Sequence, residues 1–136
     1  MSAAASTIDA TSVIVDLLAR GHAVQFRARG GSMHPVIRED DVLHVEPSLP
    51  FAPGDVVLIL ADRGLTAHRV VRRDGDTVLT RGDNAPAPDP EVDVSRVLGV
   101  VTHVERGGKR RSVAAEPRLL SLLRHLRAVR RVKGEE

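Results

Sequence analysis

The sequence predicts a mostly β, barrel-like domain with a short N-terminal helix and a basic, amphipathic C-terminal helix. Short Val-rich runs recur along most of the chain, with Gly, Pro and Asp turn signals between them, and such a series of short strands is typical of small β-barrels. Helical spacing of apolar residues occurs at the two ends. The 136 residues make one ordinary domain, which we divide into an N-terminal helix (1–21), a β domain (22–115) and a helical tail (116–136).

The N-terminal segment has the pattern of a helix followed by a strand. Apolar residues fall on one face over 7–20, and Ser6 with Asp9 three residues later resembles a capping box. Gly21 is a typical residue for the end of a helix. Residues 22–29 then alternate between apolar and other side chains, which predicts a strand.

The rest of the β domain is predicted as a series of strands and hairpins. The strands comprise residues 42–46, 55–61, 66–73, 77–81, 98–105 and 111–114. The run at 55–61 is almost continuously apolar, so we expect that strand to be buried on both faces. Turn signals at 74–76 and 107–108 each predict a hairpin. Residues 85–90, with three prolines, are predicted to form an irregular and stiff loop.

The tail has leucines at helical spacing over 117–133 and many Arg and Lys residues on its other faces. Pro117 is suited to the first turn of that helix. The favoured interpretation is a helix that packs its leucines on the β domain. The second is a peripheral membrane contact, because basic amphipathic helices bind anionic lipid. The third and least favoured interpretation of the tail is contact with a protein partner or nucleic acid.

Composition excludes several classes of function. The chain has no Cys, which removes disulfides, thiolate catalysis and Cys-based zinc sites. Phe26 and Phe51 are the only aromatic residues, too few for a surface on which nucleic-acid bases stack. The histidines show no metal-ligand spacing along the chain, so neither metal nor cofactor is predicted. They are His22, His34, His44, His68, His103 and His125. Neither a signal peptide nor a membrane span is predicted, and we expect a cytoplasmic or peripherally membrane-associated protein.

Four residues could together perform nucleophilic catalysis. Ser32 follows two glycines, His68 lies in a predicted strand, and Asp83 and Asp89 lie in or near the Pro-rich loop. A serine hydroxyl needs a neighbouring base, usually His, and a carboxylate that orients the His. Taken singly, each residue has a plainer interpretation, as a turn residue, a packed His or a loop former. Together they are the components of a Ser-His-Asp triad.

Five short motifs that surround these residues resemble the signal peptidase I family of serine endopeptidases. In chain order they are Gly-Ser-Met-His-Pro (31–35), Gly-Asp-Val-Val (54–57), His-Arg-Val-Val (68–71), Arg-Gly-Asp-Asn (81–84) and Leu-Gly-Val-Val (98–101). The resemblance covers about residues 30–104 and is closest to the archaeal and endoplasmic-reticulum branch, in which His replaces Lys as the base. It implies a mostly β catalytic domain.

The resemblance also implies a role for each residue. Ser32 would be the nucleophile, with its backbone N–H as one oxyanion donor, and His68 the general base. Asp89 would orient His68, with Asp83 as support or as the alternative third member. Met33 and Pro35 would shape the turn that carries the nucleophile and line the substrate site, and strand edges nearby would bind an extended precursor protein or peptide.

Three departures from the family keep other functions open. Gly30 stands where the family usually has a serine that assists the oxyanion hole, Asp40 replaces a glycine in the first Gly-Asp turn, and we expect no membrane anchor. One alternative is a non-catalytic peptide-binding module on the same fold, which Gly30 favours. The other is an adaptor whose basic tail binds a membrane or nucleic acid.

Overall fold

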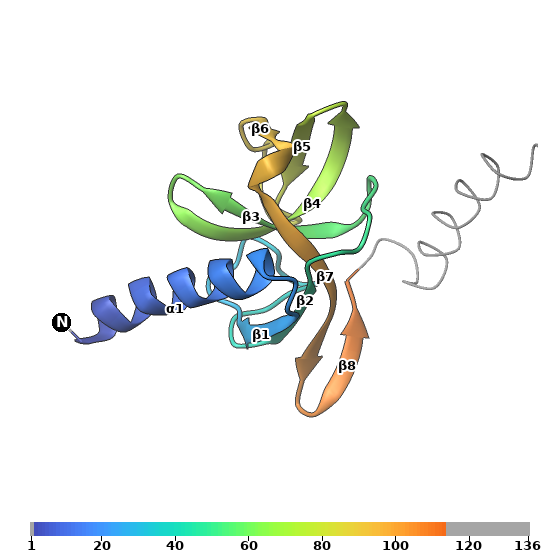
Figure 1. The fold of residues 1–136 in the computed structure, drawn as a ribbon. Helices are drawn as coiled ribbons and strands as arrows, with labels where there is room; N and C mark the ends of the chain where they lie inside the picture. Colours follow the sequence, from blue (N-terminus) through green and yellow to red (C-terminus); the bar gives the residue numbers. More distant parts are fainter. Residues whose placement is uncertain (1, 114–136) are drawn as a thin grey trace, which may run out of the picture.

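The computed structural model describes residues 2–113 and, within them, the side chains of residues 10–113. The described part is a curled, half-barrel antiparallel sheet with one N-terminal α-helix (Figure 1), so the prediction of a mostly β, barrel-like domain is confirmed. The strand order is β1-β2-β7-β3-β4-β5-β6, and β8 pairs with β7. The elements are α1 (Ser2–Ala19), β1 (Val24–Arg27), β2 (Val42–Glu46), β3 (Val56–Ala61), β4 (Gly64–Asp74), β5 (Thr77–Arg81), β6 (Val92–Asp93), the 3₁₀ helix η1 (Val94–Arg96), β7 (Val97–Arg106) and β8 (Lys109–Ser112).

The N-terminal helix is longer than predicted. It already includes residues 2–6, so the prediction that Ser6 caps its start is wrong. The physical reason is the alanine run at 3–5, because alanine has the highest intrinsic helix propensity. The helix ends as predicted: Gly21 adopts a φ of +87° and its N–H donates to the carbonyl of Leu18.

The predicted strands are all present, and β2 and β5 have the predicted bounds. The hairpins at 74–76 and 107–108 are confirmed. A further hairpin, β3–β4, closes with Ala61 paired to Gly64, and its Asp62-Arg63 turn lacks the Asn-Gly or Asp-Gly signature that would have predicted it. The first predicted strand (22–29) is shortened at both ends, to β1.

Strand β3 lies between two hydrophobic clusters, as its apolar run predicted. Val56 and Leu58 belong to the first cluster, which also contains Leu18 of α1. Val57 and Ile59 belong to the second. Burial of both faces fixes β3 within the sheet, and β3 in turn holds β4, its antiparallel neighbour.

The predicted helical tail (116–136), with its possible membrane or partner contacts, lies outside the described residues. Within the part that is described, no helix combines the length and apolarity needed to cross a membrane.

Candidate active site

Three segments that are distant in sequence meet at one point of the sheet. Strand β4 carries His68, which pairs with Val57 of β3 and is 8% exposed. The turn that follows β1 carries Ser32, which is exposed. The loop that follows β5 carries Asp89, whose N–H donates to the carbonyl of Thr80 in β5.

These three residues form a continuous chain of hydrogen bonds. His68 Nε2 lies 2.9 Å from Ser32 Oγ, and His68 Nδ1 lies 2.6 Å from Asp89 Oδ2. When the carboxylate accepts the Nδ1–H, Nε2 is left with a lone pair, which can accept the serine proton. Thr80 donates its hydroxyl to the same Asp89 oxygen at 2.7 Å, which further holds the carboxylate in place. The arrangement has the components that nucleophilic catalysis requires, namely a hydroxyl, a base within hydrogen-bonding distance of it and a carboxylate on the far ring nitrogen of that base.

The turn at residues 82–84 holds the segment that carries Ser32. The Asn84 backbone N–H donates to the Ser32 carbonyl at 2.8 Å, and its side-chain amide donates to the Gly31 carbonyl at 3.1 Å. The Asp83 backbone N–H donates to the Met33 sulfur at 3.3 Å. The backbone on both sides of the serine is therefore fixed by one neighbouring turn.

Gly82 is a site residue that sequence reasoning missed. A Cβ at this position would lie 2.6 Å from the Ser32 carbonyl oxygen and 3.1 Å from His68 Nε2. The absence of a side chain therefore allows the 82–84 turn to approach the Ser-His pair. The Arg-Gly-Asp-Asn motif contains this glycine, but the close approach of the two turns exists only in the folded chain.

Asp83 does not orient His68, and its prediction as an alternative triad member is corrected. Its two carboxylate oxygens accept from the Arg69 guanidinium, at 2.8 Å from Nε and 2.6 Å from Nη2. The same guanidinium also donates to two backbone carbonyls. Such a bidentate pair is geometrically specific, so Asp83 joins its loop to β4 and Asp89 is the carboxylate on the histidine.

The two predicted substrate-binding residues lie in different environments. Met33 is 4% exposed and belongs to the first hydrophobic cluster, so the prediction that its side chain contacts a substrate is wrong. Burial of an apolar side chain of this size in the core stabilises the fold more than exposure at a substrate site would. Pro35 is exposed and is joined to His34 by a cis peptide bond.

Gly30, which the resemblance to signal peptidase I aligns with a serine, has a φ of +82°. Residues with a Cβ are strained in this left-handed region. The backbone here is therefore suited to glycine, and the position offers no side-chain hydroxyl to an oxyanion.

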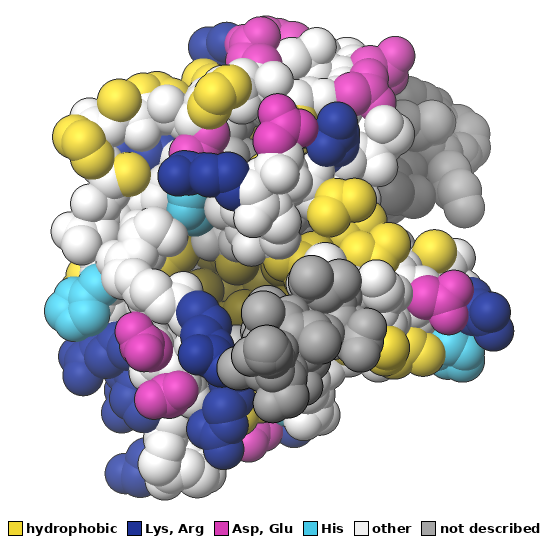
Figure 2. Space-filling view, turned by 90° about the vertical axis from the view of Figure 1, so that its left-hand side faces the viewer, with side chains coloured by type: hydrophobic (Ala, Val, Ile, Leu, Met, Phe, Trp, Pro, Cys, Tyr) yellow, Lys and Arg dark blue, Asp and Glu magenta, His cyan; other side chains and the backbone are white. Residues whose placement is uncertain are grey.

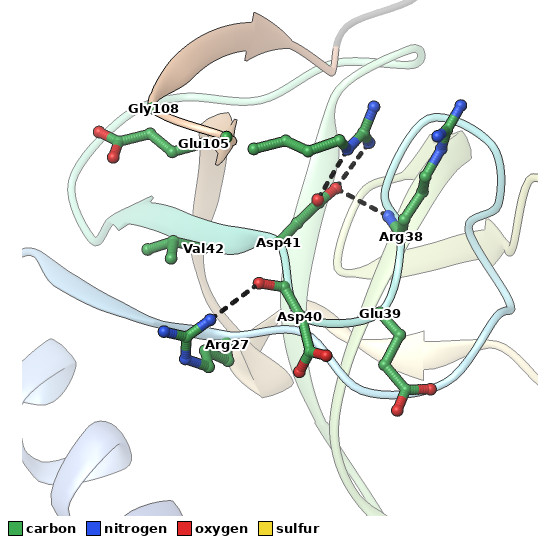
Figure 3. A pocket seen from close by; sticks show the side chains of 10 residues that line it. Arg27, Arg38, Glu39, Asp40, Asp41, Val42, Glu105 and Gly108 are labelled. Carbon is green, nitrogen blue, oxygen red and sulfur yellow. Dashed lines mark hydrogen bonds and ion pairs between the residues drawn. The ribbon is translucent and has the colours of Figure 1, made fainter.

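A separate pocket of about 430 Å³ lies beside a buried ion pair (Figure 3). The Asp41 carboxylate is 3% exposed and makes two contacts with the Arg106 guanidinium, at 2.8 and 2.7 Å. This hydrogen bonding, aided by the Arg38 N–H, holds the pKa of Asp41 below its usual value. Asp40, which the resemblance to signal peptidase I aligns with a glycine, adopts a φ of +74°. Of the described residues that line this pocket, none belongs to the Ser-His-Asp chain.

Comparison with known proteins places the chain in a family. The family model described as Peptidase S24-like matches residues 2–102, a range that includes all three residues of the hydrogen-bonded chain. The chain belongs to the Peptidase S24-like family. No curated protein gives a significant match to the chain.

Peptidase S24-like membership confirms the coarser part of the resemblance drawn from the motifs. It supports a serine peptidase-type fold within the S24 and signal-peptidase-like superfamily. Members of the Peptidase S24-like family can be non-catalytic, so membership alone does not establish catalysis by this chain.

Proposed function

We propose that this protein is a serine endopeptidase in which Ser32 is the nucleophile, His68 the general base and Asp89 the residue that orients the base. The observation that supports the proposal is the chain of hydrogen bonds from the Ser32 hydroxyl through both ring nitrogens of His68 to the Asp89 carboxylate. The histidine at the position of the base supports a relation to the Ser-His branch of signal peptidase I.

The proposed reaction follows from this geometry. As Ser32 Oγ attacks the carbonyl carbon of the scissile bond, His68 Nε2 takes the hydroxyl proton, and Asp89 stabilises the imidazolium. The Ser32 backbone N–H donates to the carbonyl oxygen, which now carries the negative charge. His68 then passes the proton to the leaving amine as the C–N bond breaks. Water, deprotonated by the same nitrogen, hydrolyses the acyl-serine and restores the hydroxyl.

The substrate class is inferred from an open strand edge next to the base. Strand β3 pairs with β4 from Gly64 to Arg69, whereas β5 pairs with β4 only from Arg69 onward. Among the described strands, none pairs with the second edge of residues 64–68. An extended segment of a precursor protein or peptide could add to this edge and bring a carbonyl to Ser32.

The apolar surface is consistent with such a substrate. Leu65 and Ala67, on the same part of β4, are partly buried against the first hydrophobic cluster. Figure 2 shows hydrophobic side chains in a hollow at the centre of one face, with charged side chains around it. The resemblance implies small residues before the cut, which a shallow apolar site of this kind would accept.

The proposal is tested by chemical labelling together with peptide digestion. The full chain is treated with a fluorophosphonate probe and, separately, with a peptide library, and both products are identified by mass spectrometry. We expect modification of Ser32 and cleavage of peptides, both lost in Ser32→Ala and His68→Ala. Ser48→Ala, which removes an exposed serine in a loop, is the matched control and should behave as wild type.

Failure of both assays in folded protein would refute the peptidase proposal. The glycine at position 30 favours one alternative, a peptide-binding module without catalysis. In that case peptides bind to the wild-type chain, none is cleaved, and Ser32→Ala binds them equally well.

A further inference from the structure

Two histidines and a glutamate form a second polar cluster, on strands β2 and β7. His44 lies directly opposite His103 in the antiparallel register, and Glu105 follows on the same face of β7. The two imidazole rings are stacked, with centroids 3.9 Å apart and planes inclined by 21°. The Glu105 carboxylate lies 3.0 Å from His44 Nε2. In Figure 3, Glu105 points away from Asp41, so its carboxylate is separate from the neighbouring ion pair.

The cluster contains buried nitrogen atoms without a hydrogen-bond partner. Nε2 of His44 and Nε2 of His103 are both buried, and neither makes a hydrogen bond among the described residues, although the Glu105 carboxylate lies close to His44 Nε2. His103 Nδ1 is already engaged with the Thr102 hydroxyl at 3.0 Å. Burial of a polar atom without a partner is unfavourable, and such atoms in a folded protein call for an explanation. A bound cation would supply one.

We propose that His44, His103 and Glu105 bind a divalent transition-metal ion, and that Zn²⁺ is the ion their chemistry fits best. Two imidazole nitrogens and one carboxylate oxygen are a common zinc donor set, with a fourth position open to water. The ligand atoms of the three residues all lie within 4.8 Å of one another.

A modest side-chain movement would complete the coordination. Ligand atoms on one tetrahedral Zn²⁺ lie about 3.4 Å apart, given Zn–N and Zn–O distances of about 2.1 Å. Stacked rings aim their lone pairs in parallel directions, so one imidazole must turn about χ2 to share an ion with the other. The Thr102 hydroxyl on Nδ1 of His103 would help to orient the Nε2 lone pair, as groups beyond the ligands do in zinc sites. The Glu105 side chain is 38% exposed, so a metal ion can reach the cluster from solvent past this residue.

The charges around the cluster are compatible with a cation. Burial lowers the pKa of His103, with the charges of His44 and Arg110 as further causes. The Glu105 carboxylate supplies a negative charge beside the two imidazole rings. Arg110 lies across from Glu105 on β8 and opposes a positive ion, so removal of its charge should strengthen binding.

The consequence of binding would be a link between β2 and β7. The register of these strands shifts next to His44, between residues 44 and 45, so the ladder is locally irregular where the ion would join them. An ion that binds only the folded chain stabilises it by mass action. The site shares no residue with the Ser-His-Asp chain, so the inference is independent of the proposed peptidase activity.

The test is calorimetric titration of the full, chelator-treated chain with Zn²⁺. We expect one ion per chain with a micromolar or lower Kd, and a higher melting temperature in its presence. His103→Ala and Glu105→Gln should each weaken binding at least tenfold, whereas Arg110→Gln should strengthen it. His22→Ala, which removes an exposed histidine outside the cluster, is the matched control and should bind as wild type.

Cobalt supplies a readout that does not depend on stability. Co²⁺ in a tetrahedral nitrogen and oxygen site absorbs in the visible range, and this absorption should appear with the wild-type chain and disappear with Glu105→Gln. Because Glu105 is partly exposed, this variant should keep the wild-type circular dichroism spectrum even if His103→Ala does not fold. Absence of binding to wild type, or equal binding by Glu105→Gln, would overturn the proposal. Equal loss in His22→Ala would show adventitious surface binding and overturn it too.

Discussion

Replacement of Gly82 by alanine is expected to disable the Ser32–His68 pair while the chain still folds. The added Cβ would lie 2.6 Å from the Ser32 carbonyl oxygen, although real Cβ contacts essentially never fall below 3.0 Å. The Ser32 segment, the 82–84 turn or both must therefore shift by at least about 0.4 Å. The 82–84 turn is tied to the same segment by hydrogen bonds, so the movement cannot be absorbed by either turn alone.

The size of the effect follows from the hydrogen bond that this movement disturbs. Ser32 Oγ lies 2.9 Å from His68 Nε2, and a displacement of 0.4–1 Å, an order-of-magnitude range, takes the pair to the limit of a hydrogen bond or beyond. A misplacement of about 1 Å lowers a catalysed rate about 100-fold. Overpacking of this kind should also cost about 1–3 kcal/mol of unfolding free energy.

The assay is the rate at which a fluorophosphonate probe modifies Ser32, measured by mass spectrometry over time. Gly31→Ala is the matched control, because a Cβ there meets no atom within 4 Å and the residue has no positive φ. We expect a loss of about two orders of magnitude in Gly82→Ala and little change in Gly31→Ala. Equal labelling rates in the two folded variants would show that the two turns do not approach each other this closely.

Three further substitutions test other parts of the structure. Asp89→Asn should lower the labelling rate of the serine by about 10²–10⁴-fold at unchanged circular dichroism, because the imidazolium of His68 loses its charge partner; an unchanged rate would argue against that role. Asp41→Asn should cost about 1.5–3 kcal/mol, the range for a hydrogen bond to a charged group. Its contact with Arg106 lowers the Asp41 pKa, so the native carboxylate adds stability above pH ~4 that is lost as pH falls through the lowered pKa. Urea unfolding across that range should therefore show a weaker pH dependence in the variant, and identical slopes would contradict this. Gly99→Ala, whose Cβ would lie 2.8 Å from a carbonyl oxygen of β2, should lower the urea midpoint by a cost of about 1–3 kcal/mol; an unchanged midpoint would contradict the close approach of β7 and β2.

Local patterns were sufficient for most of the secondary structure. The strands at 42–46 and 77–81 have the predicted bounds, and two turn signals predicted two hairpins, because alternation and turn chemistry act over a few residues. The predicted start of α1 was wrong because the capping signal at Ser6 competed with the helix propensity of the preceding alanines. The β3–β4 hairpin was missed because strand pairing closes it without a characteristic turn sequence.

The candidate site, too, was predicted only in part from the sequence. The order of the motifs identified four candidate residues but did not show which aspartate contacts the histidine. The candidates were Ser32, His68, Asp83 and Asp89. The fold makes that distinction, because Arg69, the residue after the histidine, binds the carboxylate of Asp83 and leaves Asp89 to contact the ring. Successive residues of a strand point to opposite faces, so the two carboxylates near β4 have different partners.

The class of fold, most of the strands and the kinds of chemistry available all follow from the amino-acid sequence. Hydrophobic alternation, turn residues and the absence of cysteine are properties of short segments or of composition. Which distant groups meet became visible only in the folded chain. Gly82, which has no side chain, lies beside Ser32, and His44 lies opposite His103. These contacts depend on strand register and on the curl of the sheet, which are set by packing of the whole core rather than by any local pattern.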